Sequence, residues 1–112
     1  MAETIQFNDF LKVEMRVGMV VEVKVPDWSE KLLEFRVSFG EEIGERTVFS
    51  GVKKWYSEED FLNKKFPFVV NLAERKMGPA VSQGMMMMID AGDEKPILIA
   101  LNDQAELGAV LC

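Results

Sequence analysis

Apolar residues recur along the chain at the spacing of β-strands. Residues 33–39 alternate apolar with charged or small side chains, and residues 15–25 are rich in valine, two patterns typical of strands buried on one face. Further strands are expected at residues 46–51, 66–72, 85–89 and 97–101. In residues 85–89, which begin with four consecutive methionines, alternate side chains are expected inside the core.

Turn residues and capping patterns separate these strands. Asn8 is expected to cap a brief helical turn near the N-terminus. Ser57-Glu58-Glu59-Asp60 predicts a capping box that opens a short helix between the third and fourth strands. Loops are expected at residues 26–31 and 73–83, where proline and glycine occur.

This order of elements predicts an all-β OB-fold, a five-stranded, partly open Greek-key barrel with a helix between strands three and four. We expect one domain, with the barrel at about residues 12–92 and a C-terminal strand extension at about residues 96–112. An SH3-like barrel is the alternative arrangement of the same strands.

OB-folds bind ligands across their second and third strands, near the loops expected here at residues 26–31 and 73–83. The second of these loops carries Arg75, Lys76, Ser82 and Gln83. Neighbouring side chains on an extended segment point in opposite directions, so at least one of the two cations should face a ligand.

The charge distribution limits the partners. The net charge of −6 argues against a general nucleic-acid binder, and no DNA partner is expected. Residues 50–79, however, hold six basic and four acidic groups, so this segment is +2 and the remainder is −8. Such a patch can hold a few phosphates on an otherwise repulsive body. An ordinary solvated surface explains the same numbers, and charge alone favours that explanation.

Several kinds of chemistry are missing from the sequence. It contains no histidine, a single cysteine (Cys112) and no phosphate-binding glycine motif, so neither a nucleophile–base pair nor a zinc site is expected. We therefore expect no enzyme activity and no cofactor. The chain shows neither a secretory signal nor an apolar run of the ~20 residues that span a bilayer, which favours a cytoplasmic protein without a membrane partner.

Six short motifs occur in the order found in the tRNA-binding domain family. They are Phe10-Leu11-Lys12-Val13-Glu14-Met15-Arg16-Val17-Gly18, Glu30-Lys31-Leu32, Phe49-Ser50-Gly51-Val52, Tyr56-Ser57-Glu58-Glu59, Asn71-Leu72 followed by Arg75-Lys76-Met77, and Ser82-Gln83-Gly84-Met85. The chain therefore resembles this family over nearly its whole length. The family includes the C-terminal domains of many methionyl-tRNA synthetases, free-standing tRNA-binding proteins and CsaA-type secretion chaperones. The sequence departs from the family pattern at residues 26–31 and 78–81.

The resemblance implies an OB-fold that binds tRNA largely by shape, as a homodimer built from extensions flanking the barrel. Apolar residues 97–101 and 107–111 lie where such an extension would be, and closing the barrel's own core is an equal alternative. The tRNA-binding positions that carry over are Lys31, Ser50, Asn71, Arg75, Lys76, Ser82 and Met85.

The resemblance also implies a role for each kind of side chain. Arg75 and Lys76 would pair with phosphates, and Asn71 and Ser82 would hydrogen-bond to sugar or base edges. Capping of a loop by Asn71 and bonding of the loop backbone by Ser82 are the structural alternatives.

The functional prediction is a free-standing, non-catalytic tRNA-binding protein that supplies general tRNA affinity, with a methionyl-tRNA synthetase as candidate partner. The alternative is a CsaA-type peptide-binding chaperone, in which the outward methionines of residues 85–88 form an adaptable apolar surface. A pure dimerisation module is a third interpretation. Trp55 and Tyr56 offer surfaces for base stacking, but packing over the end of the barrel is the favoured interpretation.

Overall fold

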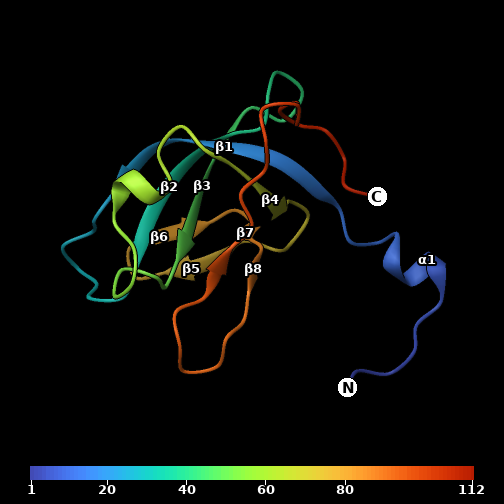
Figure 1. The fold of residues 1–112 in the computed structure, drawn as a ribbon, viewed down its shortest axis with the longest axis horizontal. Helices are drawn as coiled ribbons and strands as arrows, with labels where there is room; N and C mark the ends of the chain where they lie inside the picture. The colour runs from blue at the N-terminus through green and yellow to red at the C-terminus, as the bar shows by residue number, and fades with distance from the viewer.

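The computed structural model describes all 112 residues and contains one five-stranded antiparallel sheet (Figure 1). Its strands are β1 (Met15–Lys24), β2 (Leu33–Ser38), β3 (Glu45–Ser50), β4 (Lys65–Val69) and β7 (Met85–Met86), in the order β3-β2-β1-β4-β7. This arrangement is a nearly closed barrel and confirms the predicted OB-fold. Strands β1 and β2 each end one residue before the predicted end, and β3 both begins and ends one residue earlier than predicted.

The long strand β1 serves two neighbours. Its first half, from Met15 to Met19, pairs with β4, whereas its second half, from Met19 to Lys24, pairs with β2. The register shifts between Val20 and Glu22. An irregularity of this kind bends a strand and lets a sheet coil into a barrel.

Two hydrogen bonds close the barrel between β3 and the segment that precedes β7. The Gln83 N–H donates to the Thr47 carbonyl at 2.8 Å, and the Thr47 N–H donates to Gln83 Oε1 at 3.0 Å. The two edge strands of the sheet, β3 and β7, are therefore joined partly through the Gln83 side chain rather than through a complete β-ladder.

Phenylalanines fill the centre of the barrel. Those exposed by at most 1% are Phe35, Phe39, Phe61, Phe66 and Phe68. The Phe35 and Phe61 ring centroids lie 4.6 Å apart, and Phe39 meets Phe68 edge-on at 5.3 Å. A Cβ atom at Gly18 would lie within 2.9 Å of three core side chains, so glycine is what lets β1 approach this dense core.

Two short helical elements accompany the barrel. The 3-10 turn η1 (Glu58–Asp60) occupies the place predicted for a helix, and the Ser57 N–H donates to the Asp60 carboxylate at 2.8 Å, as expected for a capping box. The helix α1 (Phe7–Phe10) begins after Gln6, whose N–H donates to the Asp9 carboxylate at 3.2 Å. The prediction that Asn8 caps this turn is wrong. No helix here has the length and apolar character needed to cross a membrane.

The prediction of a loop at residues 73–83 is also wrong. The segment forms a β-hairpin of β5 (Arg75–Met77) and β6 (Ala80–Ser82), whose turn contains Gly78 with φ +54°. Its strands have three residues each, too few to show an alternating pattern, and the Gly78-Pro79 pair is typical of loops.

The strand expected at residues 85–89 is interrupted at Met87. After β7 has paired with β4, the Met87 N–H donates to the Pro67 carbonyl at 2.9 Å. The chain then turns, and β8 (Met88–Ile89) pairs with β9 (Ile97–Leu98). Met86 is buried and Met88 packs against the core, which confirms the predicted alternation of inward methionines.

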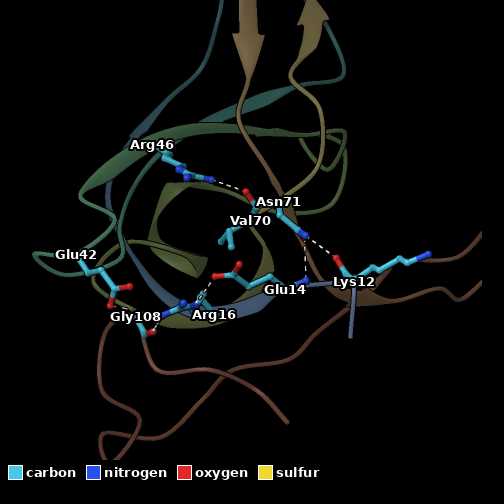
Figure 2. A network of polar contacts seen from close by, with 8 residues as sticks. All are labelled: Lys12, Glu14, Arg16, Glu42, Arg46, Val70, Asn71 and Gly108. Carbon is cyan, nitrogen blue, oxygen red and sulfur yellow. Dashed lines mark hydrogen bonds and ion pairs between the residues drawn. The ribbon is translucent and has the colours of Figure 1, made fainter. Parts of the chain in front are cut away.

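The C-terminal extension lies on its own barrel and covers two strand edges. Leu101 forms a bridge with Lys65 of β4. Residues 108–111 follow the edge of β1 beyond the end of β2, where the Val17 N–H donates to the Ala109 carbonyl at 2.9 Å. The Arg16 guanidinium also donates to the Gly108 carbonyl at 2.8 Å (Figure 2). The extension therefore satisfies backbone groups that an open edge would expose.

Candidate nucleic-acid interface

Three hollows follow one another around the end of β3. The first is lined by Phe49, Leu72, Arg75, Met77, Ser82 and Met85, the second by Ser50, Met85, Met87, Ile89 and Pro96 among others, and the third by Glu30, Lys31, Gly51, Lys54 and Trp55. The consecutive residues Phe49, Ser50 and Gly51 each border one hollow, and Met85 is shared by the first two. We call the three hollows together the β3-end surface.

Most of the predicted binding residues line this surface. They are Lys31, Ser50, Arg75, Ser82 and Met85. Lys76 does not line it. In the hairpin Arg75 pairs with Ser82 and Lys76 pairs with Val81, so the two basic side chains project from opposite faces of the hairpin. Arg75 lines the first hollow, whereas Lys76 is exposed on the other face of the hairpin.

Basic side chains without an ion-pair or hydrogen-bond partner gather around the β3-end surface. Of the 13 lysines and arginines, seven form an ion pair or donate a side-chain hydrogen bond. The remaining six are Lys31, Lys54, Lys64, Arg75, Lys76 and Lys95. Four of these six lie in the hollows or on the hairpin beside them. The surface therefore offers basic side chains that are not engaged in an ion pair, although Glu30 lines the third hollow beside Lys31 and Lys54.

Ser82 holds the hairpin against β3. Its side chain is buried, its Oγ accepts the Phe49 N–H at 3.1 Å, and its hydroxyl donates to the Gly84 carbonyl at 3.2 Å. The hydroxyl thus completes the barrel closure at a point where β3 and β6 share no regular ladder. In this position Ser82 bonds the backbone, which was the structural alternative to a hydrogen bond with RNA.

Ser82→Ala is expected to lower the free energy of unfolding by about 1–3 kcal/mol, because the buried Phe49 N–H loses its acceptor. Urea unfolding followed by circular dichroism measures this. Ser50→Ala is the matched control, since Ser50 is half-buried on the same strand and its hydroxyl has no hydrogen-bond partner. Equal stability of the two variants would contradict the assignment.

Asn71 joins the end of β4 to the N-terminal segment, away from the hollows. Figure 2 shows its amide between two backbone groups: Oδ1 accepts the Glu14 N–H at 2.9 Å, and Nδ2 donates to the Lys12 carbonyl at 2.6 Å. Because both ends of the amide are engaged, the structure places Asn71 as a clamp that orients the chain leading from α1 into β1.

Trp28 links the first loop to the hairpin, a contact that the sequence did not reveal. Its ring centroid lies 5.7 Å from that of Phe49, and a Cβ atom at Gly78 would lie 2.6 Å from the indole. Trp28 and Gly78 belong to the two segments in which the sequence departs from its family pattern. The only sign of this contact in the sequence was that both departures from the family pattern occur in loops expected to flank the ligand.

An OB-fold barrel with unpaired cations beside its third strand defines a small nucleic-acid-binding domain. The chain belongs to the tRNA binding domain family (described as "Putative tRNA binding domain"), whose model matches residues 15–110.

Curated relatives of this chain are much longer proteins. The methionine–tRNA ligase of Chromobacterium violaceum is 43% identical over 106 residues, which cover 94% of this chain and 15% of that protein. The methionine–tRNA ligase of Pyrococcus horikoshii is 37% identical over 107 residues, which cover 96% of this chain and 14% of that protein. The chain thus spans 14–15% of the length of these relatives.

Similar solved structures match the chain from end to end. A MetRS-related protein from Pyrococcus horikoshii superposes with a TM-score of 0.92 at 32% identity, covering 99% of this chain and 100% of that one. The CsaA chaperone protein from Picrophilus torridus superposes with a TM-score of 0.87 at 26% identity, covering 97% and 100%. The likeness to the chaperone is the weaker of the two.

Proposed function

We propose that this protein binds tRNA through the β3-end surface and the adjoining hairpin, and that it catalyses no reaction itself. The observation that carries the proposal is the gathering there of four basic residues that form no ion pair or side-chain hydrogen bond, on the barrel of a tRNA-binding family. They are Lys31, Lys54, Arg75 and Lys76. Phosphates can engage these cations without first breaking an ion pair, which makes the charge available for binding.

The acidic remainder of the molecule supports selectivity for a folded RNA. With a net charge of −6, the molecule as a whole repels a polyanion, whereas four of its six unpaired cations lie in one region. A rigid RNA can present several phosphates to that region at once, whereas a flexible strand must be ordered first. Because similar domains form a small part of methionine–tRNA ligases, we propose that the protein supplies general tRNA affinity to such a synthetase in the cytoplasm.

A homodimer is the assembly that we propose, because α1 leaves an apolar surface uncovered. The helix projects from the barrel (Figure 1) and has no buried residue, and Phe7 and Phe10 are 70% and 40% exposed. Together with Leu11, Val13 and Val110 of the C-terminal extension, they line one apolar hollow. A helix of four residues gains little stability alone, so packing against a second copy explains both the helix and its exposed rings.

Peptide binding of the CsaA type is a second candidate function. The second hollow of the β3-end surface favours it, since Met85 and Ile89 are 43% and 50% exposed and methionines adapt to varied apolar partners. Suppression of the aggregation of an unfolded client protein, unaffected by added tRNA, would support this function. Absence of any client binding would remove it.

Fluorescence anisotropy with labelled tRNA at low and near-physiological salt tests the tRNA-binding proposal. We expect binding that weakens as salt rises, because phosphate contacts release counterions, and that favours folded tRNA over a linear RNA of the same length. No binding even at low salt would reject the proposal.

A further inference from the structure

The third hollow of the β3-end surface contains an aromatic ring that the predicted binding residues do not include. Trp55 lines this hollow with Lys31, Lys54, Gly51 and Glu30. The Lys54 ammonium lies 5.3 Å from the centre of the Trp55 ring. A half-buried indole, two lysines without carboxylate partners and a glycine therefore meet at one place on the surface.

The neighbouring aromatic residue has a different role. The Tyr56 ring packs edge-on against Phe61 at 5.6 Å, and its hydroxyl donates to the Pro96 carbonyl. Tyr56 therefore provides the packing over the barrel end that the sequence favoured for both rings. Trp55 instead lines the hollow and is half-buried.

Local hydrogen bonds fix the shape of the hollow. The backbone N–H of Trp55 donates to the Val52 carbonyl at 3.0 Å, and the backbone N–H of Lys53 donates to the Lys31 carbonyl at 3.2 Å. The Lys53 ammonium also donates to the Ser29 carbonyl at 3.4 Å, which ties the same turn to the first loop. These bonds hold the backbone segments that carry Trp55, Lys31 and Lys54 near each other before any ligand arrives.

We propose that this hollow binds one unpaired nucleotide of the RNA, with its base stacked on Trp55 and its phosphates held by Lys31 and Lys54. The proposal rests on the tRNA-binding function proposed above and names a separate contact within it. Every base has an aromatic face, and a tryptophan beside cations is the combination that proteins use to hold single-stranded nucleotides. The long, flexible lysine side chains can follow the phosphates as the base takes its place over the ring.

Gly51 provides a way to test the hollow without disturbing the barrel. A Cβ atom there would have no neighbour within 4 Å, and the backbone has an ordinary φ. A leucine at this position can therefore fill the hollow without strain in the backbone or the core. Trp55→Leu removes the stacking surface, whereas Trp55→Phe retains an aromatic face, and thermal unfolding of each variant verifies that it is folded.

The experiment compares two labelled RNA hairpins with the same duplex, one blunt and one carrying a short single-stranded 3′ extension. We expect the unaltered protein to bind the extended hairpin about five-fold or more tightly than the blunt one, the lower range for stacking one base. In Trp55→Leu and Gly51→Leu this preference should fall to about one, whereas Trp55→Phe should retain most of it.

The outcomes separate this site from the function on which it rests. If the unaltered protein binds both hairpins equally, or if Trp55→Leu keeps the preference, the nucleotide site is overturned while tRNA binding stands. If the unaltered protein binds neither hairpin nor intact tRNA, the proposed function and this site are overturned together.

Discussion

Replacing Arg75 and Lys76 together by alanine is expected to weaken tRNA binding about ten- to one-hundred-fold, the effect of losing one charge-assisted contact or more. The two side chains leave opposite faces of the hairpin, so a bound phosphate backbone meets at least one of them. Neither has a carboxylate partner in the structure, and the substitution therefore breaks no intramolecular ion pair. Anisotropy titrations over a range of salt concentrations should also show a slope of log affinity against log salt that is flatter by roughly one to two units.

Lys64→Ala combined with Lys95→Ala is the matched control for this pair, since neither lysine forms an ion pair. It removes the same charge from exposed positions that line none of the three hollows. The control should change affinity and salt dependence far less than the hairpin pair. An unchanged salt slope in the Arg75/Lys76 variant, or equal losses in both double variants, would rule out the hairpin as the phosphate contact.

The proposed homodimer is expected to dissociate into monomers when Phe7 and Phe10 are both replaced by aspartate. The two rings account for much of the apolar surface that α1 exposes, and their centroids lie 6.4 Å apart, so both would enter the same interface. Burying two carboxylates in an apolar interface is far more costly than burying two rings is favourable. Sedimentation equilibrium measures the mass of each form directly.

Leu62→Asp combined with Val25→Asp provides the control for the charge change. Both side chains are exposed, at 38% and 47%, and neither lines the hollow beside α1. The control should remain a dimer. A monomeric unaltered protein, or a dimer that survives the Phe7/Phe10 change, would refute the assembly.

The alternation of apolar and polar residues was sufficient to predict the barrel. The period of two is complete in β2, where Leu33, Phe35 and Val37 are all buried. Strands β1 and β3 add Val20, Val23 and Val48 to the same core. Ordered motifs such as Ser82-Gln83-Gly84-Met85 were sufficient to indicate the family, which the match over residues 15–110 confirms. These features depend on residues close together in sequence, and local patterns record them.

The arrangement of the binding surface depended on contacts that local patterns do not record. The hairpin at residues 75–82 has strands of three residues, and it is held by Ser82 against Phe49 and by Gly78 against Trp28. Whether Arg75 or Lys76 lines the hollow depends on the register of that hairpin, which only its packing on β3 sets.

The same reasoning applies to individual side chains. Asn71 and Ser82 have donors and acceptors suited to RNA, and the sequence alone could not distinguish that use from a structural one. The tertiary structure shows their polar groups engaged by backbone atoms 57 and 33 residues away in sequence. Local sequence patterns therefore determined the family and the barrel. Long-range packing decided which side chains remain free to meet a ligand, because a polar side chain bonds to whichever groups the fold brings within reach.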